Sequence, residues 1–162
     1  MPEPRWLTPA QMHAWRGYRR MRALLDLQIT RDLAADSGLS DADYDVLSSV
    51  SEAPGGRLRL GELAAGMRWS VSRVSHHVSR MEQRGLVARD DCASDGRGAT
   101  VVLTDAGWRT IRDAATHHVA SVREHFIDLL DADDIAALGR IAEKVVGHLS
   151  EVTAPTPARR GR

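Results

Sequence analysis

The chain has 162 residues, which suits one domain with an appended helical element and can bury a sizeable core. Its 22 basic and 22 acidic residues give a formal net charge of zero, which argues against a purely electrostatic DNA binder. Cys92 is the only cysteine, so no intrachain disulfide and no cysteine-built zinc finger is possible. The sequence has no apolar run long enough to span a bilayer, and its opening MPEPRWLT lacks the apolar region of a signal peptide. We therefore expect a cytoplasmic protein without membrane contact.

The first predicted element is a long N-terminal helix. Thr8 can cap it, a proline follows at its first position, and Gln11 stands where a capping-box partner belongs. Ser37 and Gly38 are expected to end it. Its apolar residues cover a broader face than one partner helix needs; they include Met12, Trp15, Met21, Leu24, Leu25, Ile29 and Leu33.

Two shorter helices are predicted next. The first starts at Ser40 and stops before Pro54. A very short strand around Leu58 and Leu60 precedes the second, which covers residues 62–67.

The helix that follows a Ser70 cap carries the clearest pattern in the chain. Its apolar residues recur at spacings of three and four, which predicts one buried stripe, and Gly85 is well placed to end it. The stripe consists of Val71, Val74, Val78 and Met81.

Two strands follow, at 86–90 and 100–104, joined by the hairpin tip DCASDGRGA. Thr104 is expected to cap a long helix that runs through Leu130, and Asp131 is expected to start a last helix through Leu149. The Pro-rich, basic end of the chain predicts a disordered tail.

This order of elements predicts a mainly α-helical fold with a small β-wing. It places a winged helix-turn-helix DNA-binding domain at 39–104, dimerisation helices at 1–38 and 105–152, and the tail at 153–162. Basic residues concentrate in the winged unit, since residues 57–97 hold eight arginines against five acids. A lone winged unit does not need the wide apolar faces of the flanking helices. We therefore expect a homodimer that presents two recognition helices to a palindromic site.

The polar face opposite the valine stripe is the expected DNA-reading surface. An arginine there can donate two hydrogen bonds to guanine, whereas Ser and His suit phosphates or base edges. Ser70 and Ser72 lie near the helix N-terminus, whose free backbone N–H groups can hold a phosphate. The alternative is an ordinary solvated face, above all for the two histidines. The residues expected to point outward are Ser72, Arg73, His76, His77, Ser79, Arg80 and Gln83.

The wing tip holds the segment from Asp95 to Gly98. Arg97, flanked by glycines at a tight turn, can enter a narrow minor groove where negative potential is concentrated. Asp95 is placed to orient that guanidinium. The alternative is a surface hairpin with an ordinary charge pair.

These stretches resemble the MarR (multiple antibiotic resistance regulator) family of bacterial transcription factors. The resemblance lies in LGELAAGM, SVSRVSHHVSRMEQRGLVAR and SDGRGATVVLTDAGW, and the family's helix order spans about residues 8–150. It implies a homodimer that binds double-stranded DNA at a palindromic operator, usually as a repressor that a small molecule releases. Carried over by position, the groove-facing residues would be Ser72, Arg73, Ser75, His76 and Arg80, with Arg97 as the wing contact.

The resemblance also implies an effector pocket between the dimer helices and the winged unit, and a small aromatic acid is the expected ligand. Plain core packing is the alternative for its aromatic residues. The expected walls are Trp6, Trp15, Tyr18 and Trp69, and the candidates for holding an anion are Arg16, Arg19 and His13.

Metal and redox sensing are less favoured. The adjacent pairs His76-His77 and His117-His118 cannot present both rings on one helix face, so no metal and no cofactor is expected. Cys92 lies near Arg89, which would lower the pKa of a thiol, but the neighbouring aspartates oppose this, and an incidental cysteine is the favoured interpretation.

The sequence favours a DNA-binding regulator over a protein-docking module and over an enzyme. A DNA-binding transcriptional regulator explains the arginines of the reading face and the wing. A winged module that docks proteins without binding DNA would favour exposed aromatic residues there instead. An enzyme fits least, because the sequence has no nucleophile-base pair, phosphate loop or metal-ligand spacing.

Overall fold

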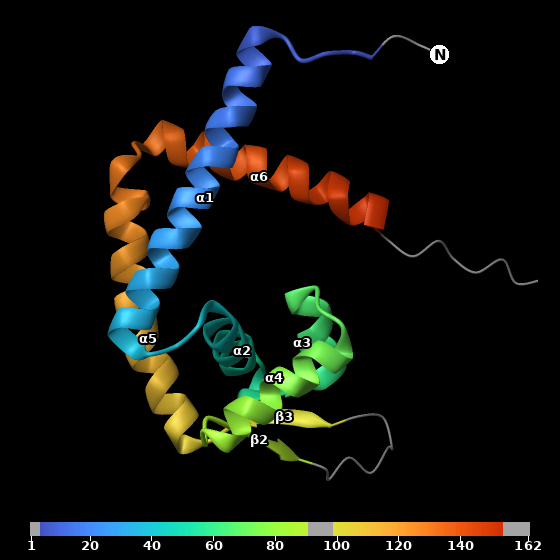
Figure 1. The fold of residues 1–162 in the computed structure, drawn as a ribbon, viewed down its shortest axis with the longest axis vertical. Helices are drawn as coiled ribbons and strands as arrows, with labels where there is room; N and C mark the ends of the chain where they lie inside the picture. The colour runs from blue at the N-terminus through green and yellow to red at the C-terminus, as the bar shows by residue number, and fades with distance from the viewer. Residues whose placement is uncertain (1–3, 91–98, 154–162) are drawn as a thin grey trace, which may run out of the picture. The chain divides into compact units, whose positions relative to one another are not determined.

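The computed structural model describes residues 4–90 and 99–153, and they form a mainly helical fold with a three-stranded sheet (Figure 1). The chain divides into two compact units, one up to Val122 and one from Arg123 onward. The elements, in chain order, are α1 (Pro9–Ser37), α2 (Asp41–Glu52), η1 (Pro54–Gly56), β1 (Arg57–Arg59), α3 (Leu60–Met67), α4 (Val71–Gln83), β2 (Val87–Asp90), β3 (Thr100–Leu103), α5 (Asp105–His125), η2 (Ile127–Leu129) and α6 (Ala132–Thr153).

Local capping sets the helix starts, as the sequence predicts. Thr8 caps α1 and Ser40 caps α2, each with a reciprocal capping box completed by Gln11 and Asp43. Gly38 ends α1 at a φ of +66°, in the left-handed region that favours glycine.

The sheet has the order β1-β3-β2, and both pairings are antiparallel. The short strand expected around Leu58 is confirmed, but Leu60 already begins α3, two residues before the predicted start. The backbone N–H of Leu60 donates to Ala99 O at 3.0 Å, which joins the beginning of the helix to the sheet. The expected 62–67 helix is therefore longer, because Glu62 accepts a hydrogen bond from the Arg59 backbone and caps the first turn.

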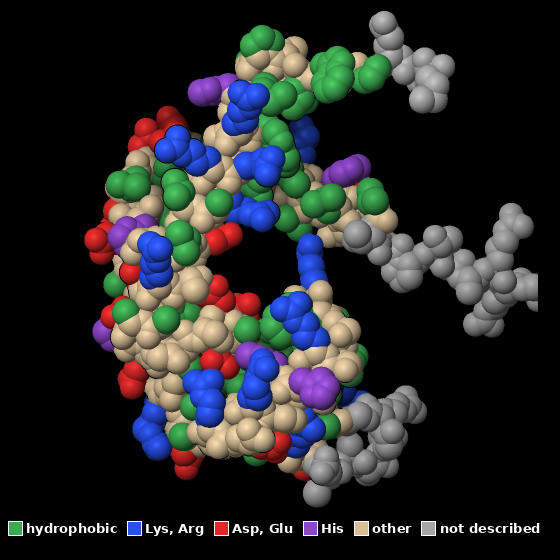
Figure 2. Space-filling view, in the orientation of Figure 1, with side chains coloured by type: hydrophobic (Ala, Val, Ile, Leu, Met, Phe, Trp, Pro, Cys, Tyr) green, Lys and Arg blue, Asp and Glu red, His purple; other side chains and the backbone are tan. Residues whose placement is uncertain are grey.

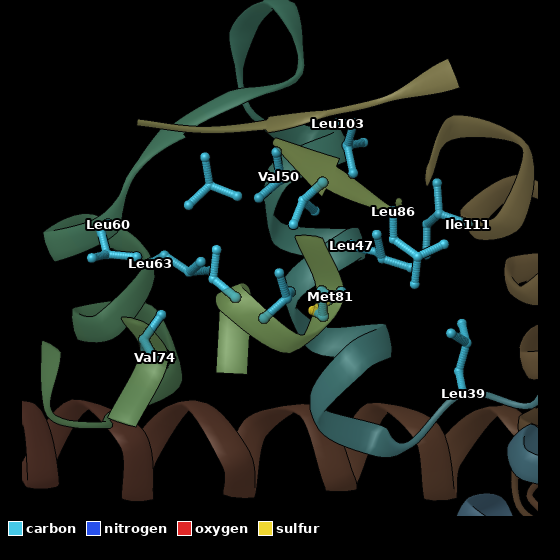
Figure 3. Packing of buried hydrophobic residues seen from close by; sticks show 14 of the residues in the cluster. Leu39, Leu47, Val50, Leu60, Leu63, Val74, Met81, Leu86, Leu103 and Ile111 are labelled. Atoms are coloured by element: carbon cyan, nitrogen blue, oxygen red, sulfur yellow. The ribbon is translucent and has the colours of Figure 1, made fainter. Parts of the chain in front are cut away.

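The core lies inside the winged unit. Val74, Val78 and Met81 of α4 are fully buried and belong to one cluster with apolar side chains of α2, α3, β2, β3 and α5 (Figure 3). Val71 was expected in the same stripe, but it is 53% exposed, because it opens the helix at the surface before α4 reaches the core. The stripe therefore begins one turn later than the sequence suggests.

Close packing joins the hairpin to α5. The Thr104 hydroxyl donates to Gly85 O at 2.7 Å and accepts from the Gly107 backbone N–H at 3.0 Å, which confirms Thr104 as the cap of α5. A Cβ atom at Gly107 would lie 2.0 Å from Leu86 O, so only glycine fits this close approach.

The last two helices end differently from the prediction. The expected helix through Leu130 is wrong, since α5 stops at His125. Phe126 leaves helical geometry (φ −143°, ψ −65°), and a single 3-10 turn follows, which the continuing apolar pattern did not indicate. Asp131 starts α6 as expected, accepting from the Asp134 backbone N–H at 2.8 Å. The predicted disordered tail lies, apart from Thr153, outside the described residues, and Thr153 is the last residue of α6.

Candidate DNA-binding interface

Helix α4 presents a polar face on the surface of the winged unit. Ser72, Arg73, His76 and Arg80 are exposed, opposite the buried Val74, Val78 and Met81. Basic and histidine side chains gather over the region where Figure 1 draws α3 and α4 (Figure 2). The structure thus brings these four predicted residues together on one accessible helix face.

The turn before α4 fixes its start. Arg68 ends α3 at a φ of +54°, and the Trp69 backbone N–H donates back to Ala64 O at 3.0 Å. The Ser70 hydroxyl accepts from the Arg73 backbone N–H at 3.2 Å and so caps α4. This cap occupies the Ser70 side chain, which was also predicted to contact DNA.

Arg73 stacks on the tryptophan of that turn. Its guanidinium carbon lies 3.5 Å from the centroid of the Trp69 ring, a cation-π contact at the rim of the reading face. Trp69 is half-buried against the core and meets His77 edge-on, with ring centroids 5.8 Å apart. Trp69, which was predicted to line an effector pocket, therefore supports two residues of α4.

His77 faces inward, so its predicted outward position is wrong. The residue is only 6% exposed, and its Nδ1 lies 2.9 Å from Arg80 Nη2. Its Nε2 lies 3.1 Å from Asp43 Oδ1 of α2, a close electrostatic contact that is not aligned for a hydrogen bond. A signal for burial was present, because His77 lies three residues after Val74 and four before Met81.

Asp43 is the buried acid beneath α4. It accepts from Arg84 Nη1 at 2.8 Å and from the Ser40 backbone N–H at 3.2 Å. Burial by itself would raise the pKa of Asp43, but the hydrogen bonds from Arg84 and Ser40 and the Arg84 charge outweigh it and hold the pKa below 3.8. Asp43 is therefore ionised at neutral pH and ties the end of α4 to α2.

Arg89 of β2 links the wing to the middle of α4. Its Nη2 donates to Ser75 O at 2.7 Å, to Ser79 Oγ at 2.8 Å and, more weakly, to Ser75 Oγ at 3.3 Å. The predicted DNA contact Ser75 is half-buried and faces this arginine. Sequence patterns did not assign Arg89 to the site, because its partners lie 10 and 14 residues away on another element.

The base of the wing is described, but its tip is not. Arg57 of β1 forms an ion pair with Asp90 at the end of β2. The predicted wing residues Asp95 and Arg97, and Cys92 as well, lie outside the described residues.

The predicted effector residues fall into two groups. Trp15 and Tyr18 stack on α1, with ring centroids 5.8 Å apart and planes at 26°, and both are half-exposed. Trp6 precedes α1 and is 82% exposed, and Arg19 is exposed on α1. Trp69 lies apart from them in sequence and contacts Arg73 and His77 of α4. A shallow hollow on α1 includes His13 and Arg16, two of the predicted anion-holding candidates.

Neither a metal cluster nor a membrane span is found in the described part of the chain. No group of three or more His, Cys, Asp or Glu side chains there could hold a metal ion. No described helix is both long and apolar enough to cross a bilayer.

A helix-turn-helix followed by a two-stranded wing defines this chain as a winged helix-turn-helix protein. A sequence profile of the MarR family matches residues 37–98. AbsC, a MarR family regulator from Streptomyces coelicolor, is 42% identical, with a TM-score of 0.86 over 91% of this chain and 99% of that one. The chain belongs to the MarR family of transcriptional regulators.

Two further relatives agree with this assignment. Sco3205, a MarR family regulator from the same organism solved in complex with DNA, is 38% identical, with a TM-score of 0.85 over 98% of this chain and 97% of that one. The transcriptional regulator HosA from Escherichia coli is 26% identical over 132 residues, which are 81% of this chain and 95% of HosA.

Proposed function

We propose that this protein is a homodimeric, sequence-specific DNA-binding regulator that represses from a palindromic operator and is released by a small-molecule effector. The observation that carries the proposal is the exposed Ser72, Arg73, His76 and Arg80 on the second helix of a helix-turn-helix. A 38% identical relative of nearly the same length was solved with DNA, which supports the same use of this fold.

The chemistry of the reading face suits DNA better than protein. Arg73 and Arg80 carry guanidinium groups that can bind guanine edges or phosphates. The aromatic residue at this face, Trp69, is half-buried under Arg73 rather than presented to a partner. A protein-docking surface would instead expose aromatic anchors, so DNA binding is the better-supported function.

Dimerisation is supported by apolar side chains that the described chain leaves uncovered. In α6 no residue whose side chain is described is buried, and in α1 only Leu33 is buried. Exposed apolar surface of this extent is typical of a subunit interface. The exposed large side chains are Trp15, Tyr18, Met21, Leu24 and Leu27 in α1, and Ile135, Ile141, Val145, Val146, Leu149 and Val152 in α6.

An effector site is supported by the aromatic and basic groups of α1. The Trp15–Tyr18 pair offers a stacking surface for an aromatic ring, and His13 and Arg16 lie on the same helix as partners for a carboxylate. Release requires a ligand that binds one shape of the dimer more tightly than another. Isothermal calorimetry with a panel of aromatic acids, followed by operator binding in their presence, tests this part of the proposal.

Selection of DNA fragments from a random pool tests DNA recognition. The purified protein should enrich a palindrome whose half-site centres lie about one helical turn apart, and its mass in solution should be that of two chains. Enrichment of no common sequence would contradict sequence-specific binding. A monomeric mass at the concentration that binds DNA would contradict the dimer.

A further inference from the structure

We infer that buried His77 is a positioning residue: in its neutral form it holds the Arg80 side chain on the reading face of α4, so that protonation of His77 lowers sequence discrimination. The inference rests on the proposed function, since it concerns how well Arg80 reads DNA. His77 itself is too deeply buried to touch DNA.

The contact geometry requires one protonation state of the ring. The Arg80 guanidinium has only hydrogen-bond donors, so the His77 Nδ1 at 2.9 Å must accept with a free lone pair. The single ring proton then lies on Nε2, facing the Asp43 carboxylate at 3.1 Å. Neutral His77 thus presents an acceptor to Arg80, and its ring proton lies on the side of the Asp43 carboxylate.

Protonation removes the acceptor. The imidazolium ring carries a proton on both nitrogens, so a donor and a positive charge then face the Arg80 guanidinium. Arg80 is exposed and free to swing away, whereas His77 is locked by packing against Trp69 and the core. The arginine would therefore lose the support that fixes its direction.

The groups around His77 keep it neutral at physiological pH. Burial lowers the pKa of His77, the Asp43 carboxylate opposes this, and the Arg80 and Arg84 charges lower it further. The balance places the pKa below 6.5. Asp43 comes from α2, Arg80 from α4, Arg84 from the residue that ends α4, and Trp69 from the turn before it.

The hydrogen bond from Arg80 to His77 has a direct consequence for sequence specificity. A long side chain that is already fixed in its binding direction loses less conformational freedom when it meets a base edge. A contact to phosphate tolerates many directions, so binding to non-operator DNA depends less on this support. The expected signature is a change in the ratio of operator to non-operator affinity, rather than in overall affinity.

The test measures that ratio by fluorescence anisotropy between about pH 4.5 and pH 8, using the selected operator and a scrambled duplex. For the wild type, the ratio should stay constant above pH 6.5 and fall as the pH passes through the lowered pKa of His77. His77→Asn retains an acceptor near the Nδ1 position but cannot titrate, so its ratio should stay close to the wild-type value and be flat with pH. His77→Gln extends its amide toward Asp43, offers no acceptor at the Nδ1 position, and should lower the ratio about fivefold at all pH values.

His76 provides the matched control, because it is the adjacent histidine but is exposed. His76→Gln should keep the pH dependence of the ratio, whatever it does to affinity. Unchanged circular dichroism and unchanged affinity for the scrambled duplex identify variants that still fold.

Two results would overturn the inference. One is a wild-type ratio that stays well above one and does not change with pH, which needs no variant to observe. The other is equal ratios for His77→Asn and His77→Gln, since a purely structural role would not distinguish the two acceptor positions. A wild-type ratio of one at every pH would instead show that the proposed function has failed, and the inference with it.

Discussion

Helices α4 and α6 are both amphipathic, but they use their apolar residues differently. In α4, Val74, Val78 and Met81 are buried in the core of the same chain, and the polar face opposite them is exposed. In α6, apolar residues such as Ile141 and Val145 remain more than half exposed. The winged unit therefore has a core of its own, whereas the described chain leaves much of the apolar surface of α6 uncovered, as the proposed dimer requires.

The first prediction concerns the core of the winged unit. Met81→Ala removes a fully buried side chain from α4 and should lower the free energy of unfolding by about 3 kcal/mol. Urea denaturation followed by circular dichroism measures this change. Val71→Ala on the same helix is the control and should change it by less than about 0.5 kcal/mol, because Val71 is exposed. Equal losses for the two variants would contradict the assigned core.

The second prediction concerns the terminal helices. Ile141→Glu places a charge in the exposed apolar face of α6, so it should shift the protein toward monomer without unfolding the winged unit. Operator affinity should fall about a hundredfold, because two linked recognition helices become two independent ones. Sedimentation velocity and fluorescence anisotropy measure the two effects. Arg140→Gln, at the exposed neighbouring position, is the control. A fully dimeric Ile141→Glu protein would exclude α6 from the interface.

The third and smallest effect is the pH dependence of stability. The pKa of Asp43 is lowered in the folded protein, so its stabilising contribution is present above 3.8, the ordinary Asp value, and is lost as pH falls through the lowered value. The urea concentration at the unfolding midpoint of the wild type should therefore decrease when the pH is lowered below about 4, and Asp43→Asn should show a smaller decrease. Asp26→Asn removes an exposed carboxylate from α1 and should behave like the wild type. The same acid sensitivity in Asp43→Asn and the wild type would contradict the role assigned to this carboxylate.

Local signals predicted most of the fold, because they act between residues a few positions apart. The caps at Thr8, Ser40 and Ser70 and the glycine stop at Gly38 depend on short-range hydrogen bonds and backbone geometry. The break at Phe126 has no such signal, since the apolar pattern continues across it.

The site was predicted less completely, because its support comes from distant elements. The exposed Arg73, His76 and Arg80 follow from the helix period alone. The pairing of His77 with Asp43 joins α4 to α2, and the Arg89 contacts join a strand to a helix. These pairings are set by tertiary packing, which the spacing of residues along one helix does not encode.

The central claim is that the exposed face of α4 reads DNA sequence, and Arg73→Ala tests it most directly. Arg73 lies on that face and makes no described contact with the core other than its stack on Trp69. The measurement is the ratio of affinities for the selected operator and a scrambled duplex, at fixed salt concentration. We predict that Arg73→Ala lowers this ratio about tenfold and relaxes the base preference at one position of each half-site. An unchanged ratio, with the fold and the dimer intact, would contradict the claim.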